Sequence, residues 1–224
     1  MNTQAPEKIN YDLEGNLDVV DIFYSFQGEG PLVGTPAVFI RTYGCNLRCS
    51  WCDTDYTTNK QRMSVEELMD TVKSFPLVAV SGQRPLVVLT GGEPFRQNIE
   101  PLVFALVKHG YRVQIETNGS LEPKGVRWTQ LRSWVDIICS PKPGVTVAPT
   151  IREWVDAIKY VLDSSYVDEE DGLPKRLPRF SWTPVYVQPM DGPDYNRNVE
   201  AAVQSCLKHG YRLSIQVHKI VGVQ

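Results

Sequence analysis

The sequence predicts an α/β fold, a partial TIM-like barrel of about six β-α units built on a parallel sheet. One observation is that apolar runs with strand composition alternate with segments of helical period along the chain. Another is an internal echo, Leu106-Val-Lys-His-Gly-Tyr-Arg-Val and Cys206-Leu-Lys-His-Gly-Tyr-Arg-Leu, each typical of a helix closed by glycine before a strand. About six units are too few for a closed eight-stranded barrel, so an open or partial barrel is favoured, with a doubly wound sheet as the alternative.

The expected strands are apolar runs, several of them rich in Val, Ile, Phe and Tyr. In chain order they are Val19–Phe26, Ala37–Thr42, Leu86–Leu89 and Tyr111–Glu116, followed by the apolar runs Val135–Cys139 and Ala157–Leu162. The turn-rich stretch Gln27-Gly-Glu-Gly-Pro separates the first two. In a parallel β-α sheet, the strand C-termini and the loops after them carry the chemistry.

Helices are expected between these strands. Ser64 and Glu67 have the spacing of a capping box, which predicts a helix through about Ser74. A second helical pattern covers Ile99–Lys108. The charged, proline-rich segment Asp168–Pro184 is expected to be a surface insertion.

Length and composition indicate one domain. The 224 residues are 42% hydrophobic, which can supply one substantial core. Residues 1–18 are expected to form a polar N-terminal extension, and residues 19–224 the domain itself. Lys plus Arg total 23 against 26 Asp plus Glu, a formal net charge of −3, so nucleic acid and anionic membranes are not expected as partners.

A cytoplasmic location is expected. The stretch from Met1 to Asn16 is polar and has no apolar core resembling a signal peptide, and no run approaches the length needed to span a bilayer. In a reducing compartment, five cysteines favour metal binding or catalysis over disulfides.

Three cysteines, Cys45, Cys49 and Cys52, lie in one short loop directly after the apolar run Ala37–Ile40. A structural zinc site usually closes with four protein ligands, whereas three thiolates indicate a centre with one open position. Two alternatives stay open: a buried helical stripe, because the spacing is i, i+4 and i+7, and a zinc site completed by a histidine. Gly44 and the polar residues of the loop disfavour the stripe.

The motif Cys-x3-Cys-x2-Cys, with Trp51 just before the last cysteine, resembles the signature of the radical S-adenosylmethionine (radical SAM) superfamily. The run Leu86-Val-Val-Leu-Thr-Gly-Gly-Glu-Pro supplies the glycine-rich motif that the same family carries after its next strand. The resemblance implies that three thiolates hold a 4Fe-4S cluster whose fourth iron takes the amino and carboxylate groups of S-adenosylmethionine (SAM). By itself, Gly-Gly-Glu-Pro is also typical of an ordinary turn.

Seven further motifs resemble the narrower family of 7-carboxy-7-deazaguanine synthases, from about residue 20 to the end of the chain. They are Phe26-Gln-Gly-Glu-Gly, Phe39-Ile-Arg, Cys52-Asp-Thr-Asp, Glu116-Thr-Asn-Gly, Ser140-Pro-Lys, Val187-Gln-Pro-Met-Asp and Gln216-Val-His-Lys. This resemblance implies a radical ring contraction of 6-carboxy-5,6,7,8-tetrahydropterin to 7-carboxy-7-deazaguanine with loss of ammonia, in queuosine and deazapurine biosynthesis. It also implies Mg²⁺, a homodimer and an electron donor such as flavodoxin.

Carried over residue by residue, the resemblance implies a role for each of the following side chains. Substrate binding falls to Phe26, Gln27, Gly28, Arg41, Thr90, His218 and the terminal carboxylate of Gln224, and catalytic polar or proton-transfer roles to Glu29 and Glu116. SAM contacts fall to Trp51, Gly91, Gly92, Glu93, Ser140, Pro141, Lys142, Gln188, Pro189, Met190 and Asp191. Metal ligation falls to Cys45, Cys49 and Cys52 for the cluster and to Thr54 for magnesium, which prefers oxygen.

Several simpler interpretations stay open. Arg41 is also consistent with a surface ion pair, Glu116 with a solvated strand end and His218 with a half-exposed strand residue. The family often has an aromatic residue after His-Lys and an apolar residue last, where this chain has Ile220 and Gln224. Two other functions remain, a small radical activase that installs a glycyl radical on a partner protein and a zinc-stabilised binding module.

Overall fold

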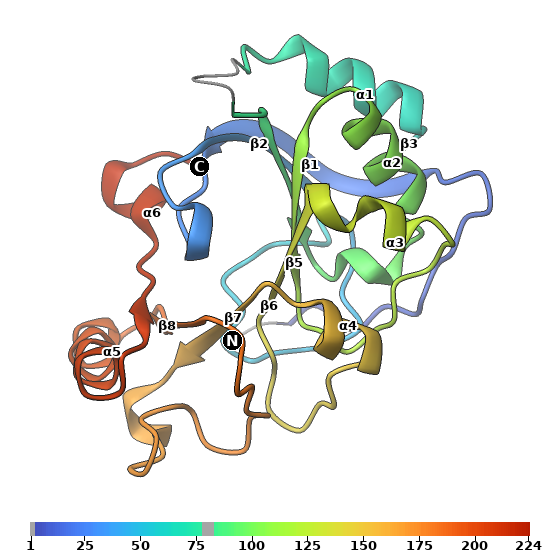
Figure 1. The fold of residues 1–224 in the computed structure, drawn as a ribbon. Coiled ribbons are helices and arrows are strands. Elements are labelled where there is room, and N and C mark those ends of the chain that lie inside the picture. Colours follow the sequence, from blue (N-terminus) through green and yellow to red (C-terminus); the bar gives the residue numbers. More distant parts are fainter. Residues whose placement is uncertain (1–2, 78–82) are drawn as a thin grey trace.

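A computed structural model describes residues 3–77 and 83–224, and its strands form one mixed sheet (Figure 1). The strand order is β3-β1-β2-β4-β5-β6-β7-β8-β9. The strands are β1 (Leu17–Phe26), β2 (Pro36–Thr42), β3 (Gln61–Met63), β4 (Leu86–Gly91), β5 (Arg112–Thr117), β6 (Val135–Cys139), β7 (Ala157–Leu162), β8 (Val185–Pro189) and β9 (Arg212–Leu213). Within the described ranges β3 and β9 have no partner on their outer sides, so the sheet is open.

All neighbouring pairs from β2 to β9 are parallel, which confirms the predicted partial barrel. The parallel sheet has one antiparallel edge that was not predicted, because β1 pairs antiparallel with both β2 and β3. The connection from Gln27 to Thr35 is too short for the crossover that a parallel pair needs, and it suits a hairpin-like return instead.

Helices pack against the outer face of this sheet. They are α1 (Val65–Ser74), α2 (Glu100–Lys108), α3 (Trp128–Leu131), α4 (Pro149–Trp154) and α5 (Tyr195–His209), while the short α6 (Val217–Val221) lies apart from them near β1 (Figure 1). Short 3-10 turns are η1 (Gly30–Leu32), η2 (Pro94–Arg96), η3 (Arg132–Trp134) and η4 (Ser164–Tyr166). Because the helices cover one face, the doubly wound alternative was wrong.

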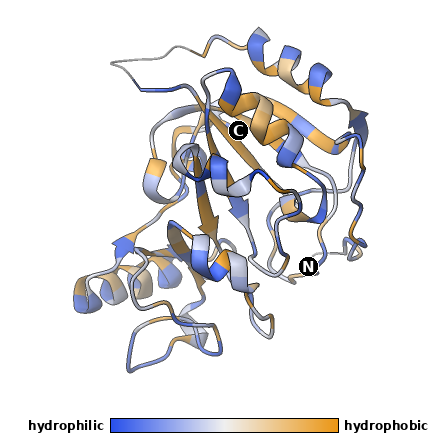
Figure 2. Ribbon diagram, turned by 45° about the vertical axis from the view of Figure 1, so that its right-hand side comes forward, coloured by the Kyte–Doolittle hydropathy of each residue, from blue (hydrophilic) through white to orange (hydrophobic). Residues whose placement is uncertain are grey.

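Side chains alternate between the two faces of each strand, as the period of two requires. The outward residues, such as Ile40, Leu89, Ile115 and Tyr160, join the helices in one apolar core. In Figure 2 the central strands are largely hydrophobic, and the helices alternate between hydrophobic and hydrophilic stretches. The inward residues near the strand C-termini are mostly polar, so the inner face is available for chemistry.

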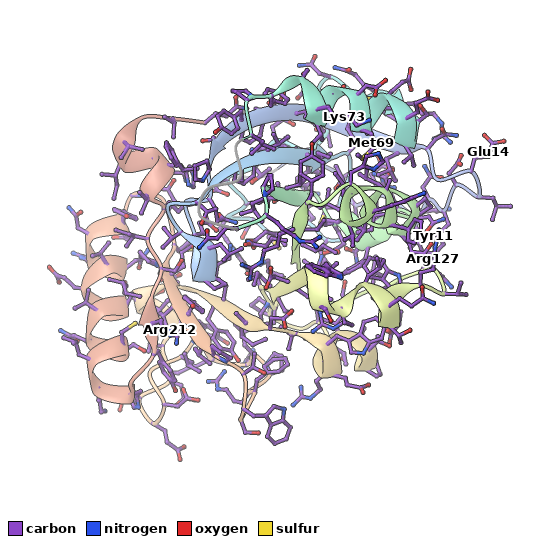
Figure 3. All side chains as sticks on the ribbon, turned by 45° about the horizontal axis from the view of Figure 1, so that its top comes forward. Tyr11, Glu14, Met69, Lys73, Arg127 and Arg212 are labelled. Atoms are coloured by element: carbon purple, nitrogen blue, oxygen red, sulfur yellow. The ribbon has the colours of Figure 1, made fainter. Side chains whose placement is uncertain are left out.

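The capping box is present at the start of α1. The Ser64 Oγ accepts a hydrogen bond from the Glu67 N–H at 3.2 Å, and the Glu67 carboxylate accepts one from the Ser64 N–H at 2.7 Å. Met69 on this helix faces the core and Lys73 points outward (Figure 3). The predicted helix therefore begins and ends where its sequence indicated.

Two connecting segments are more firmly packed than the sequence indicated. The expected surface insertion 168–184 buries Leu173 and Leu177 in the main core, and the Ser205 Oγ of α5 donates to the Gly172 carbonyl at 2.6 Å. The N-terminal segment crosses the cysteine loop, where the Glu7 N–H donates to the Cys45 carbonyl at 2.7 Å. None of the helices in the described parts of the chain combines the length and the apolar character needed to span a bilayer.

Candidate active site

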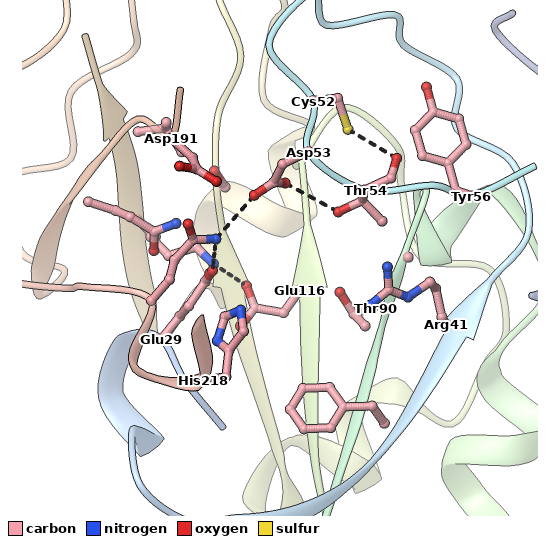
Figure 4. A pocket seen from close by; sticks show the side chains of 18 of the residues that line it. Glu29, Arg41, Cys52, Asp53, Thr54, Tyr56, Thr90, Glu116, Asp191 and His218 are labelled. Carbon is pink, nitrogen blue, oxygen red and sulfur yellow. Dashed lines mark hydrogen bonds and ion pairs between the residues drawn. The ribbon is translucent and has the colours of Figure 1, made fainter. Parts of the chain in front are cut away.

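A cavity of about 470 Å³ lies inside the curved sheet, at the C-terminal ends of the parallel strands (Figure 4). Inward-facing side chains of successive strands form its wall: Arg41 from β2, Thr90 from β4, Glu116 from β5, Lys159 from β7 and Gln188 from β8. The cysteine loop and α6 complete it. This volume suits a small molecule, and the location is the one in which β-α folds concentrate their chemistry.

The three thiols of the cysteine loop line the same cavity. Burial raises the pKa of each of them, that of Cys45 to about 12, so a metal would bind by displacing protons from them. In the described parts of the chain no three His, Cys, Asp or Glu side chains are already grouped as a metal site. The loop thus supplies three soft donors that need to converge on the group they bind.

Close backbone contacts join the cysteine loop to the glycine-rich motif. The Gly92 N–H donates to the Thr42 carbonyl at 3.1 Å and the Glu93 N–H to the Gly44 carbonyl at 3.0 Å. A Cβ on Gly92 would lie 1.8 Å from the Gly44 oxygen, which no real side chain tolerates. Gly91 and Gly92 were predicted to contact SAM. The structure adds a different reason for glycine at position 92, because the cysteine loop leaves no space for a side chain there.

Glu93 does not line the cavity, contrary to the expected direct SAM contact. Its buried carboxylate accepts hydrogen bonds from the N–H groups of Phe95 and Asn118, at 3.1 and 2.7 Å, and from the Thr117 hydroxyl at 2.7 Å. Burial raises its pKa despite these donors. Glu93 therefore ties the loop after β4 to the end of β5. Pro141 is also buried and outside the cavity lining.

Lys142 places a half-buried cation beside the thiols. Its Nζ donates to the carbonyl and the hydroxyl of Ser140, at 2.8 and 2.7 Å, and it forms no ion pair with an acid among the residues that the structure describes. Burial lowers the pKa of Lys142, and the Cys49 thiol opposes that shift. A cation without a carboxylate partner suits a ligand that brings negative charge to this end of the cavity.

The opposite end of the cavity has two walls of unlike character. On one, Lys159 pairs with the carboxylates of Glu29 and Glu116, the latter at 3.0 Å; we call these three residues the acidic wall. On the other, the Arg41 Nε is buried without a hydrogen-bond partner in the described structure, and the guanidinium carbon lies 5.4 Å from the centre of the Phe23 ring. Figure 4 shows Arg41 and Thr90 across the cavity from Glu29.

Helix α6 closes the cavity over the acidic wall. The Lys219 Nζ donates to Asp53 of the cysteine loop at 2.8 Å and to Asp191 after β8 at 2.6 Å. His218 packs on Gly28, where a Cβ would lie 1.9 Å from the imidazole Nδ1. Burial lowers the pKa of His218, against the opposing effect of Glu29. His218 thus belongs to a helix, and the alternative of a strand residue was wrong.

Comparisons with known proteins agree with this arrangement. Residues 39–136 match the profile of the Radical SAM superfamily. A 7-carboxy-7-deazaguanine synthase from Rhodospirillum rubrum is 42% identical, with 93% of each chain covered. One from Rickettsia prowazekii is 39% identical, with 93% of this chain and 89% of that protein covered.

The chain belongs to the 7-carboxy-7-deazaguanine synthase family.

The crystal structure of QueE from Escherichia coli has the same fold, with a TM-score of 0.67 at 24% identity over 90% of this chain and 94% of that one. Membership of a radical SAM family implies a 4Fe-4S cluster and SAM as cofactors. These relatives do not favour the alternative of a glycyl-radical activase.

The structure brings nearly all of the family's expected site residues into one cavity. Every residue predicted above to bind or react lines it except Glu93 and Pro141. The Thr54 hydroxyl donates a hydrogen bond to the carboxylate of the adjacent Asp53 at 3.4 Å. At the C-terminus, the Ser25 hydroxyl donates a hydrogen bond to the Gln224 carbonyl.

Sequence reasoning in terms of the 7-carboxy-7-deazaguanine synthase motifs missed several polar residues of this cavity. Among them are Asp53, Lys159, Gln216 and Lys219. Lys159 carried a usable signal, because a lone lysine in the apolar strand Ala-Ile-Lys-Tyr-Val-Leu is difficult to bury without a partner. Asp53 lies in the motif Cys52-Asp-Thr-Asp, and Gln216 and Lys219 lie in Gln216-Val-His-Lys. The predictions took Thr54 and His218 from these motifs and gave these three neighbours no role.

Proposed function

We propose that this protein is a 7-carboxy-7-deazaguanine synthase, a carbon-nitrogen lyase that contracts the ring of 6-carboxy-5,6,7,8-tetrahydropterin and releases ammonia. The observation that carries the proposal is the cavity in which three thiols, the acidic wall and Arg41 meet, where the buried Arg41 Nε has no hydrogen-bond partner among the described residues. The name of these relatives gives the product, and the cavity gives a physical reason to extend that activity to this chain.

The two walls match the two ends of the proposed substrate. A pterin ring carries N–H donors along its pyrimidine edge, and the 6-carboxylate lies at the other end of the bicycle. Glu29 and Glu116 offer acceptors for the N–H groups, while the Arg41 guanidinium can bind the carboxylate through two parallel hydrogen bonds. The ring would then lie between them, with C6 on the side of Arg41.

The cysteine end of the cavity suits the family's cofactors. Three thiols with no fourth cysteine beside them in the cavity lining of the described chain fit a 4Fe-4S cluster with one open iron, and the cation of Lys142 suits the negative charge of thiolates and of a SAM carboxylate. When bound, the cluster and SAM supply the radical chemistry that removes a hydrogen atom from C6 of the pterin. The protein's own part is to orient C6, exclude water and hold Glu29 and Glu116 where a proton can be exchanged.

Magnesium belongs to this proposal through Thr54. The ion prefers oxygen ligands and keeps several waters, so one hydroxyl with substrate oxygens can complete its coordination. Asp53 lies beside Thr54 and is held by Lys219 and Gln216, so it is available to orient a bound water. We extend the proposal to a homodimer in the cytoplasm that is reduced by a flavodoxin, on the basis of the family resemblance.

The test is turnover by protein that has been reconstituted with iron and sulfide without oxygen. Pterin substrate, SAM and a reductant are supplied with and without Mg²⁺, and the release of ammonia and 7-carboxy-7-deazaguanine is measured. We expect product that depends on SAM and increases with Mg²⁺. The matched control is the same protein without SAM. Absence of product from brown, fully loaded protein would contradict the proposal.

A further inference from the structure

The acidic wall contains a buried cation between two carboxylates from distant segments. Lys159 on β7 pairs with Glu29, from the loop after β1, and with Glu116 at the end of β5. Its side chain is 8% exposed, against 16% for Glu29 and 14% for Glu116. Two negative charges therefore share one positive charge where water has little access.

The remaining contacts of both carboxylates come from neutral donors. The Gln216 amide donates to Glu29 at 2.8 Å, and the amides of Gln114 and Gln27 donate to Glu116. An ionised carboxylate accepts at both oxygens, whereas a protonated one turns one oxygen into a donor. The arrangement consequently fits two ionised carboxylates, and Lys159 is the cation that makes direct contact with both.

We propose that Lys159 is a positioning residue, which keeps Glu29 and Glu116 both ionised so that the acidic wall presents only acceptors to the N–H edge of the pterin. This inference rests on the proposed function for the identity of the ligand. Its electrostatic part concerns only this chain. Without the ammonium, two nearby carboxylates in a shielded site would share a proton, and a donor would then face the ligand's own donors.

Other charged groups near the wall do not replace Lys159. His218 faces Glu29 from α6, Lys142 faces Lys159 from the loop after β6, and Asp53 and Lys219 lie beyond Gln216. Although burial works against ionisation, Lys159 holds the pKa of Glu29 below its usual value. In the same way, Glu116 and Glu29 raise the pKa of Lys159 against the effect of burial.

The sign of the pH effect follows from these contacts. In a variant without the ammonium, the two carboxylates lose their shared cation, so burial and mutual repulsion favour the uptake of a proton as the pH falls. Affinity for the pterin should then be lost toward low pH and recovered toward high pH, while the wild-type affinity stays level over the same range. Replacement by arginine keeps the charge and should keep the wild-type profile.

The experiment compares reconstituted wild type with Lys159→Met, Lys159→Gln and Lys159→Arg. Infrared difference spectra across a pH titration, without pterin, detect the C=O band of a protonated carboxyl group. The matched control is Lys219→Met, which also loses a lysine shared by two carboxylates, but at a 40% exposed position where water can keep both acids ionised. KM and kcat for the pterin are then measured over the same pH range.

We expect the protonated-carboxyl band in Lys159→Met and Lys159→Gln. It should be absent from the wild type, from Lys159→Arg and from the control Lys219→Met. We also expect a KM raised roughly 10-fold or more near neutral pH with a smaller change in kcat, and partial or full rescue by arginine. If Lys159→Met does not fold, the Gln and Arg variants make the same comparison. No band, or a KM and pH profile equal to wild type, would overturn the inference. The two parts can also fail separately. If the Lys159 variants show the band but the wild type does not convert the pterin, the proposed function is wrong and the charge role of Lys159 is retained.

Discussion

Arg41 and Lys159 are both inward-facing cations at the carboxyl ends of strands, yet their surroundings are opposite. Lys159 has two carboxylates within ion-pair distance, whereas Arg41 has an aromatic ring and a buried Nε without a partner in the described structure. A buried polar group without a partner costs stability, so it is usually retained for a ligand. We therefore expect the proposed substrate carboxylate to bind at Arg41.

Replacement of Arg41 by glutamine should raise the KM for the carboxylated pterin roughly 10- to 100-fold, because a charge-assisted hydrogen-bonded pair is lost. Steady-state kinetics checks this. Arg112→Gln is the matched control, since Arg112 pairs with Asp136 at a partly exposed position outside the cavity lining. A KM unchanged in Arg41→Gln would remove the proposed carboxylate contact.

Replacement of Cys49 by alanine should prevent cluster assembly, because the proposed cluster needs all three thiols of the cysteine loop. Most of the fold should be retained, because Cys49 lies in that loop and not in the apolar core. Iron content and visible absorbance after oxygen-free reconstitution measure the loss, and circular dichroism measures the fold. Cys206→Ala, in the outer helix α5, is the control and should retain iron. Full iron and activity in Cys49→Ala would exclude the cluster assignment.

Individual site residues were predictable where a motif marked them and missed where the signal was electrostatic. The motifs located the cysteines, Arg41 and both glutamates in one cavity. Lys159 was missed because the strand around it was considered only as an apolar run. Glu93 was predicted to contact SAM, because sequence cannot show that its oxygens already accept hydrogen bonds from neighbouring residues.

At the scale of elements, strand alternation separates stability from chemistry. Outward residues join one apolar core, and inward residues near the strand ends form the cavity wall. The long periodic elements were predictable for this reason. The short edge strands β3 and β9 were not, because they depend on contacts with strands distant in the sequence, whereas the antiparallel pairing of β1 with β2 follows from a short connection whose length was not used in the prediction.

Replacement of Ser64 by alanine should lower the free energy of unfolding by about 0.5–2 kcal/mol, because the Glu67 N–H loses its hydrogen bond to the Ser64 hydroxyl, while the backbone N–H of residue 64 can still donate to the Glu67 carboxylate. Denaturant titration of the reconstituted protein measures this. Ser74→Ala, at the other end of the helix, is the control. KM should not change, since α1 lies on the outer face; a raised KM would show that α1 affects the site.

At the scale of the molecule, the cavity is closed by segments from both halves of the chain. The N-terminal segment contacts the cysteine loop through Glu7, and α6 contacts it through Lys219 and Gln216. Lys219 also binds Asp191, so one ammonium joins three separate segments at the rim. The cavity therefore depends on segments before and after residues 39–136, the part of the chain that matches the Radical SAM superfamily.

Replacement of Lys219 by alanine should speed amide hydrogen exchange in α6 and in the cysteine loop, with a loss of global stability of only about 0–1 kcal/mol because the pairs are partly exposed. High salt should have a similar effect on wild type through screening. Arg197→Ala, which removes an exposed pair with Asp194 on α5, is the control. Exchange in α6 equal to wild type would contradict this role.

The separation between Lys219 and Asp53 along the chain has a consequence for biosynthesis. During translation, Asp53 of the cysteine loop is synthesised 166 residues before Lys219, the lysine that binds it. At roughly 5–20 residues per second this interval is about 10–30 s. During that time the loop is accessible to whatever delivers iron and sulfide, and the late arrival of α6 then encloses the centre, so the order of translation favours metal insertion before closure.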